Sequence, residues 1–201
     1  MAKAQARESS DVRENILAVG QRIMSAKGFS AVGLNEILTE AQVPKGSFYH
    51  YFASKEGFGE ALLASYFEAY LGDIDRVLGQ ADCTMAQRLL NYFDLWRANQ
   101  SFQDCQGKCL AVKLAAEVAD LSEAMRAVLE RGTAAIVARL AAAIEAGVAE
   151  GSLAIDDPAG QVAHSLYQVW LGASVMVKIV RGVAPFDSAM GLTRRLLHLP
   201  G

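Results

Sequence analysis

A cysteine beside two lysines is the feature of this sequence most able to do covalent chemistry. Cys109 follows Lys108 and lies four residues before Lys113, at the predicted start of a helix. A helix N-terminus and neighbouring ammonium groups both lower the pKa of a thiol, and the thiolate is the form that attacks electrophiles and oxidants. Cys105, four residues earlier in a predicted loop, could act as a resolving thiol if that loop bends. Two interpretations remain open for Cys109, a reactive sensor or a buried and inert cysteine.

Lys178 is the second candidate for this chemistry. It is the only charged residue in the apolar run 175–180, on a helix that we expect to be covered on both sides. A lysine in such surroundings usually extends its ammonium group to water; otherwise it needs an anionic partner. A thiolate would serve as that partner, so we group Lys178 with Cys109 as a candidate redox sensor.

The run VPKGSFYHYF, residues 43–52, has residue types that bind DNA. A short helix starting after Pro44 would present ammonium, hydroxyl and imidazole groups to phosphates and base edges in a major groove. The candidate DNA contacts are Lys45, Gly46, Ser47, Tyr49, His50, Tyr51 and, at the start of the next helix, Lys55. Phe48 and Phe52, four residues apart, are expected to anchor this helix in a small core. The alternative is that all these aromatic side chains only form the core of a three-helix unit.

Other catalytic or metal chemistry has little support in the sequence. The three histidines lack metal-ligand spacing, and the chain has no Cys-x-x-Cys pair and no glycine-rich phosphate loop. We therefore expect no metal and no cofactor. The remaining alternative from this class is an enzyme with an active site in a helical bundle, whose nearest carboxylates are Glu117, Asp120 and Glu123. These residues are more typical of solvated helix ends, so we expect the protein not to be an enzyme.

The composition predicts a large core and no general affinity for polyanions. The chain has 201 residues, 52% of them hydrophobic, and a formal net charge of −3. Any binding to nucleic acid therefore has to be local. Residues 41–55 contain Lys45 and Lys55 without any acidic residue, so the positive charge is concentrated at the candidate DNA contacts.

The N-terminus and the cysteines predict a cytoplasmic protein. The first residues, MAKAQARESSD, lack the apolar stretch of a secretory signal, and three cysteines without a dense framework fit a reducing compartment. Residues 158–177 carry no Asp, Glu, Lys or Arg, and the segment is as long as a membrane span, but polar side chains interrupt it. We expect this segment to be a buried helix and the protein to have no membrane partner.

Helix-forming residues dominate between the four prolines, which predicts an all-α fold. Apolar residues recur at helical spacing in about nine segments. The expected helices are 11–27, 34–40, a short helix after Pro44, 54–77 with Ser54 as its N-cap, 85–101, one from about residue 108, 122–150, 158–181 and 186–199. The second and third of these, joined by a tight turn, predict a helix-turn-helix.

The run GFSAVGLNEILTEAQVPKGSFYHYFASKEGF, residues 28–58, resembles the DNA-binding region of the TetR family of transcriptional repressors. The resemblance implies a three-helix helix-turn-helix head, residues 1–53, and a helical effector-sensing and dimerisation body, residues 54–201. It also implies a homodimer that pairs through its last two helices and binds double-stranded operator DNA. Many relatives open the second helix with a phosphate-binding Thr. This chain has Gly33 there, whose backbone amide could serve instead.

In such a repressor the body binds the effector, and large side chains are the candidates for its ligand pocket. They are Trp96, Phe102, Met125, Tyr167, Trp170 and Met176. At helical spacing the same residue types more often pack in a core or a dimer interface. Both interpretations remain open at this point.

Two further stretches, residues 109–126 and 167–179, resemble the electrophile-sensing, NemR-like group of this family. The resemblance implies that Cys109 senses an electrophile or oxidant and that Lys178 lies near it. Cys83 and Cys105 match no position of that group. Acrylate-responsive repressors share the head and a Gly-Cys-Leu stretch, so a purely noncovalent effector such as a small organic acid is the alternative. We therefore expect a repressor that leaves its operator when Cys109 is modified or a small ligand enters the body.

Overall fold

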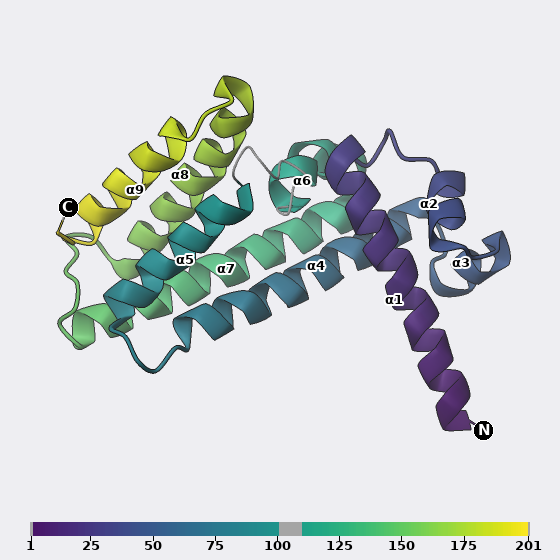
Figure 1. Ribbon diagram of the computed structural model, residues 1–201, viewed down its shortest axis with the longest axis horizontal. Helices are drawn as coiled ribbons and strands as arrows, with labels where there is room; N and C mark the ends of the chain where they lie inside the picture. The colour runs from purple at the N-terminus through teal and green to yellow at the C-terminus, as the bar shows by residue number, and fades with distance from the viewer. Residues whose placement is uncertain (1, 101–109, 201) are drawn as a thin grey trace. The chain divides into compact units, whose positions relative to one another are not determined.

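The computed structural model describes residues 2–100 and 110–200, and side chains from residue 11 onward. The described residues form nine α helices and no strand (Figure 1). The helices are α1 (Ala2–Lys27), α2 (Leu34–Ala41), α3 (Lys45–Tyr51), α4 (Lys55–Leu78), α5 (Met85–Gln100), α6 (Leu110–Leu121), α7 (Glu123–Ala149), α8 (Ala159–Val180) and α9 (Ala184–Leu196). The all-α fold predicted from the sequence is confirmed.

The helix boundaries follow the sequence pattern except at the N-terminus, where α1 begins at Ala2 and not near residue 11. Residues 2–10 lack an apolar face, but their Ala, Arg, Gln and Glu residues favour a helix by intrinsic propensity. At the other end of α1, Gly28 has a left-handed φ of +92°, and its amide donates to the Met24 carbonyl oxygen at 2.8 Å. The predicted N-cap of α4 is confirmed, since Ser54 Oγ accepts a hydrogen bond from the Gly57 amide at 3.1 Å.

The chain divides into two compact units. The first unit comprises residues 1–67 and 109–130, and the second comprises residues 68–108 and 131–201. Helices α1, α2, α3 and α6 therefore belong to the first unit, and α5, α8 and α9 belong to the second. The boundary after residue 53, which separates DNA binding from effector sensing, concerns function and stays a prediction.

An aromatic cluster holds α3 in the first unit. Phe48 of α3 is fully buried, and its ring centroid lies 5.2 Å from that of Phe52 and 5.4 Å from that of Phe58 in α4. Gly20 of α1 allows this packing, because a Cβ atom there would lie 2.3 Å from the Phe58 ring. The prediction that Phe48 and Phe52 anchor α3 in a core is confirmed.

The turn between α2 and α3 depends on a left-handed residue, Gln42, whose φ is 56°. The Gln42 amide donates to the Thr39 carbonyl oxygen at 3.2 Å, and the Val43 amide donates to the Leu38 carbonyl oxygen at 3.1 Å. These bonds satisfy carbonyl groups at the end of α2. Pro44 then caps α3, where its missing amide hydrogen removes no helical hydrogen bond. The predicted helix-turn-helix is therefore present.

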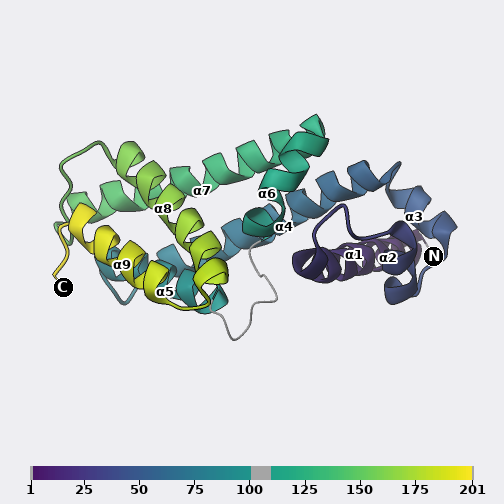
Figure 2. The ribbon, with the colours of Figure 1, turned by 90° about the horizontal axis from the view of Figure 1, so that it is seen from above.

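An aromatic core joins α5, α8 and α9 in the second unit, where these helices lie side by side (Figures 1 and 2). Trp170 of α8 is fully buried. The Phe93 ring of α5 stacks on it at 4.8 Å and the Phe186 ring of α9 at 5.6 Å, measured between centroids. The uncharged segment predicted to be a buried helix thus supplies the central residue of this core.

Helix α7 is, among the described residues, the one helix long and apolar enough to cross a membrane by length and composition. A helix in the core of a helical bundle can have the same composition. In this structure Leu140 and Ile144 of α7 are fully buried, and Arg139 forms an ion pair with Asp75 at 2.6 Å. Helix α7 therefore uses its apolar face for packing within the protein.

Candidate nucleic-acid interface and sensor site

Helix α3 buries one large side chain and leaves polar ones accessible. Phe48 is fully buried, whereas Tyr49 is 50% exposed. Of the predicted DNA contacts on this helix, Lys45, Gly46, Tyr49 and His50 are exposed, and Ser47 and Tyr51 are half-buried. The alternative of a purely structural aromatic cluster therefore fits Phe48 and Phe52 but not Tyr49.

Ring contacts order the exposed side chains of α3. Lys45 Nζ lies 5.9 Å from the centroid of the Tyr49 ring, which packs edge-on against Phe48 at 5.6 Å. His50 packs edge-on against Tyr51 at 4.9 Å. A Cβ atom built at Gly46 would meet no atom within 4 Å, so the surface is open there. Several hydrogen-bond donors thus lie on one short helix. Because ring contacts already order their side chains in part, binding a partner costs less conformational entropy.

Lys55, the predicted DNA contact on α4, has a partner inside the first unit. Its Nζ donates a hydrogen bond to the Phe29 carbonyl oxygen at 2.9 Å and lies 4.6 Å from the centroid of the Phe29 ring. The side chain is half-buried. Lys55 is therefore engaged with Phe29 within the first unit, and a contact between Lys55 and DNA stays a prediction.

Glu117 of α6 is a residue that the sequence did not assign to any binding site. Its Oε2 accepts a hydrogen bond from the Phe29 amide at 3.0 Å, and its Oε1 accepts one from the Ser30 amide at 2.6 Å. Burial raises the pKa of this carboxyl group. The hydrogen bonds from Ser30 and Phe29, together with the charge of Lys55, outweigh burial, so the pKa of Glu117 lies below its ordinary value. Glu117 is therefore held as a carboxylate against the loop between α1 and α2.

Of the predicted sensor residues, the structure describes only Lys178. Cys109 and Cys105 lie outside the described residues. Lys178 is half-buried near the end of α8, next to Val177, which is fully buried, and Ile179, which is 67% exposed. In the single chain, α8 is therefore covered on one side at this position. The pairing of Lys178 with Cys109 stays a prediction.

Three of the six predicted pocket residues lie together and fill the core of the second unit. Trp96, Tyr167 and Trp170 are each at most 5% exposed, and the Trp96 ring lies 5.7 Å from that of Tyr167 and 6.0 Å from that of Trp170. The indole N–H of Trp96 donates to Ser174 Oγ at 2.9 Å, and that of Trp170 donates to Thr193 Oγ1 at 3.0 Å. Both indole groups are thus satisfied within the protein.

The other three predicted pocket residues do not join this group. Met176 of α8 is 44% exposed. Met125 is fully buried in the first unit beside Gly59, where an added Cβ atom would lie 2.5 Å from the Met125 sulfur. Phe102 lies outside the described residues. The assignment of all six side chains to a ligand pocket stays a prediction.

A hollow of about 300 Å³ in the second unit was not predicted. Its lining residues are Asp75, Leu78, Gly79, Met85, Arg139, Ala142 and Ala143. Arg139 donates from Nε to Asp75 Oδ1 at 2.6 Å and from a terminal nitrogen to Asp75 Oδ2 at 3.1 Å. The hydrogen bond from Arg139 lowers the pKa of Asp75. The two charges therefore neutralise each other, and the rest of the lining is apolar.

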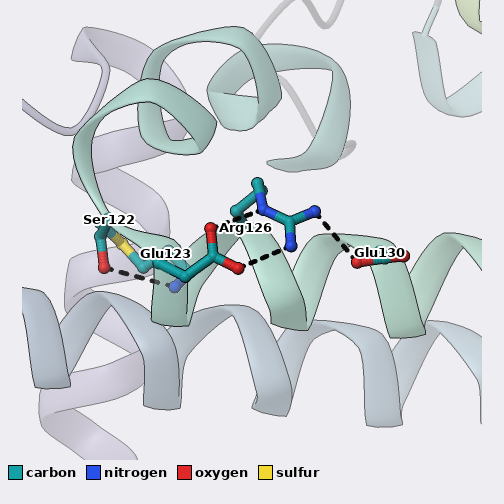
Figure 3. A network of polar contacts seen from close by, with 5 residues as sticks. Ser122, Glu123, Arg126 and Glu130 are labelled. Carbon is teal, nitrogen blue, oxygen red and sulfur yellow. Dashed lines mark hydrogen bonds and ion pairs between the residues drawn. The ribbon is translucent and has the colours of Figure 1, made fainter.

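The three carboxylates named as candidates for an enzyme active site, Glu117, Asp120 and Glu123, do not form one site. Glu123 is exposed and pairs with Arg126, which also bonds Glu130 on the outer face of α7 (Figure 3). Asp120 is exposed on α6, and Glu117 is used as described above. In the described part of the chain, no group of three or more His, Cys, Asp or Glu side chains could hold a metal ion. These carboxylates are therefore surface and loop-binding groups.

Two family models match the chain. The model for bacterial regulatory proteins of the tetR family matches residues 16–62, and the model for the tetracyclin repressor-like C-terminal domain matches residues 86–192. The first match contains the helix-turn-helix with α3. The second covers most of the chain beyond α4.

The chain is similar over almost its whole length to transcriptional regulators. It is 38% identical over 194 residues to the HTH-type transcriptional repressor NemR of Escherichia coli (strain K12), covering 94% of this chain and 96% of that protein. It is 33% identical over 176 residues to the HTH-type transcriptional repressor DhaR of Mycobacterium sp. (strain GP1), covering 88% and 87%. Among solved structures, reduced E. coli NemR has a TM-score of 0.89 and 38% identity, and the match covers 95% of this chain and 99% of that one.

Proposed function

Because the chain belongs to the TetR family of transcriptional regulators, we propose that it leaves its operator when an electrophile or oxidant modifies Cys109 or a small ligand enters the body, residues 54–201. Repressors of this family bind operator DNA and act as dimers, and they are not enzymes. The single observation that carries operator binding is helix α3, the proposed DNA-reading helix, which exposes Lys45, Tyr49 and His50 while Phe48 holds it in a core.

The proposed DNA contacts are on α3. The ammonium group of Lys45 and the hydroxyl groups of Ser47 and Tyr49 are suited to phosphate oxygens or base edges, and His50 is suited to a phosphate. Gly46 supports close approach because nothing occupies the space around it, and Tyr51 is next to His50 on the same helix. In a dimer, two such helices would enter successive major grooves roughly 34–36 Å apart.

The proposed dimer interface is on α8 and α9. The part of α8 near its C-terminus leaves large apolar side chains exposed, and Val183 just before α9 adds another. The exposed large apolar residues are Val175 (47%), Met176 (44%), Ile179 (67%), Val180 (51%) and Val183 (42%). A contiguous apolar surface of this kind is typical of a protein interface. A second subunit would cover this face and bring Lys178 nearer to burial.

The proposed covalent switch is addition of the Cys109 thiolate to an activated alkene such as N-ethylmaleimide. A carbon–sulfur bond forms, the alkene double bond is lost, and water supplies a proton to the neighbouring carbon. A mixed or protein disulfide, formed after oxidation by hypochlorite, would be the reversible version. The alternative is a noncovalent effector such as a small organic acid. In both cases the effector changes operator occupancy only through its different affinity for the two states of the repressor.

We also propose that residues 1–53 carry out DNA binding and residues 54–201 carry out sensing and dimerisation. A repressor of bacterial type works where the chromosome is, so we place the protein in the cytoplasm. The division of roles is supported by two separate family models, which match residues 16–62 and 86–192.

A gel shift tests the function directly. Purified protein is mixed with the intergenic DNA upstream of its own gene, with and without N-ethylmaleimide or hypochlorite, and then with dithiothreitol. We expect binding without reagent, release with either reagent and recovery by dithiothreitol only after hypochlorite. Cys109→Ser should bind DNA normally and resist release, while Cys83→Ser should behave as the wild type. Normal release from Cys109→Ser would overturn the covalent switch and favour the noncovalent alternative.

A further inference from the structure

Helix α6 holds the loop between α1 and α2 through one carboxylate. Glu117 accepts hydrogen bonds from two successive backbone amides of this loop, those of Phe29 and Ser30. The helix packs beside the C-terminal end of α1 in the first unit (Figure 1). Two charge-assisted hydrogen bonds to consecutive amides fix the direction as well as the position of a loop.

Lys55 completes this contact at the same residue, Phe29. Phe29 donates its N–H to Glu117 and accepts at its carbonyl oxygen from Lys55. The Lys55 ammonium also lies over the Phe29 ring at 4.6 Å. One residue of the loop is therefore held between an anion from α6 and a cation from the first turn of α4.

Gly28 shows that the space for this contact is narrow. Its φ of +92° is strained for any residue with a side chain, and an added Cβ atom would lie 3.0 Å from Glu117 Oε2. The loop can adopt this conformation next to the carboxylate only because residue 28 is glycine. The contact thus depends on a specific backbone shape and not merely on opposite charges at a surface.

We propose that Glu117 and Lys55 are positioning residues for DNA binding, which clamp Phe29 between α6 and α4 and so hold the helix-turn-helix in its binding arrangement. This inference rests on the proposed function. It gives Lys55 a different role from the phosphate contact predicted from the sequence. It also makes α6, the helix that follows Cys109 in the chain, a direct support of the DNA-binding head.

Operator binding by the full-length protein at several salt concentrations tests the clamp. The variants are Lys55→Gln, Glu117→Gln and the double variant. Each single change should weaken binding about tenfold, because the apparent dissociation constant rises as the fraction of binding-competent protein falls. The double variant should be no weaker than the weaker-binding single one, since both changes break the same clamp. The salt dependence of all three should match that of the wild type.

Two matched variants separate positioning from simple charge effects. Lys45→Gln removes a proposed phosphate contact. The slope of the logarithm of the binding constant against the logarithm of the salt concentration should therefore become shallower by about 0.9 per contact. Asp120→Asn removes the same charge as Glu117→Gln from an exposed position on α6, and it should bind as the wild type does. A third variant, Glu117→Asp, keeps the charge but withdraws the carboxylate by one methylene group. Its loss of operator binding should be smaller than that of Glu117→Gln, and it replaces Glu117→Gln in the test if that variant folds poorly.

Three results would be decisive against the clamp. A salt slope for Lys55→Gln as shallow as that for Lys45→Gln would assign Lys55 to a phosphate. Additive losses in the double variant would mean that the two residues act independently. Binding by Glu117→Gln equal to that of Asp120→Asn would leave Glu117 without a role. If the wild type and Asp120→Asn both fail to bind the operator, the proposed function falls instead.

Discussion

Both units bury aromatic side chains, but in the first unit α3 also leaves one of them, Tyr49, outside the core. In the first unit, Tyr49 is 50% exposed on a helix of seven residues and lies next to Lys45. In the second unit, Trp96 and Trp170 are buried, and both indole N–H groups bond to hydroxyls within the protein. An exposed ring beside a lysine is available to a partner, whereas a buried ring with a satisfied indole contributes to packing. Exposure, more than residue type, therefore separates side chains available to a partner from those that stabilise the core of this chain.

Trp170→Ala should produce the largest loss of stability. We expect the free energy of unfolding to fall by about 3–5 kcal/mol, because a large cavity would open between Phe93 and Phe186. Urea unfolding followed by circular dichroism measures this loss. Tyr49→Ala is the matched aromatic control, and its loss should stay within about 1 kcal/mol. Equal losses in the two variants would break the contrast between the units.

Lys45→Ala should have the reverse effect, with operator binding weakened about tenfold and stability unchanged. A charge-assisted contact to DNA is worth about 1–3 kcal/mol, while an exposed lysine contributes little to folding. A binding titration with the operator measures the first effect, and analytical ultracentrifugation checks the dimer. Arg131→Ala removes the same charge from an exposed position in the second unit and serves as the control. Unaltered binding by Lys45→Ala would show that α3 is not the reading helix.

The sequence predicted the helix-turn-helix well because its determinants are local. Pro44 marks the start of α3, and the spacing of Phe48 and Phe52 identifies the side of the helix that is buried. A turn, a cap and one apolar face all lie within a few residues of one another. The same reasoning correctly left Tyr49 and His50 outside the core.

Long-range partners could not be predicted in the same way. Helical periodicity identified Trp96 and Trp170 as large inward-facing residues but could not tell a ligand pocket from a packed core, because that depends on α5, α8 and α9 together. Glu117 was assigned to a solvated helix end, yet its bond to the Phe29 amide spans 88 residues of sequence. Such a pairing depends on the tertiary structure, and the local spacing of residues in the sequence does not reveal it.

The loop contact of Glu117 predicts a specific dependence of stability on pH. The pKa of Glu117 is lowered from 4.5 on folding, so its contribution is complete above about that pH and is lost as pH falls through the folded-state pKa. We expect Glu117→Gln to be about 1–2 kcal/mol less stable than the wild type at pH 7. That difference should shrink below pH 4.5 in urea unfolding experiments. A difference that does not change with pH would mean that packing and not charge stabilises the contact.

The two glycines that bound this loop should respond oppositely to substitution, which gives the smallest but sharpest test. Gly33 has φ of −81° and ψ of 150°, and an added Cβ atom would meet nothing within 4 Å. Gly33→Thr should therefore gain roughly 0.5 kcal/mol, because Thr caps α2 and restricts the unfolded chain, which would raise Tm by about 1–2 °C. Gly28→Ala should lose more than about 1 kcal/mol through its positive φ and its contact with Glu117. Combining Gly28→Ala with Glu117→Ala should cost less than the sum of the two single losses, because Glu117→Ala removes the carboxylate oxygen that a Cβ atom at residue 28 would meet. If the threonine hydroxyl at residue 33 also reaches a phosphate, Gly33→Thr will bind the operator more tightly than the wild type, whereas Gly33→Val will gain no affinity.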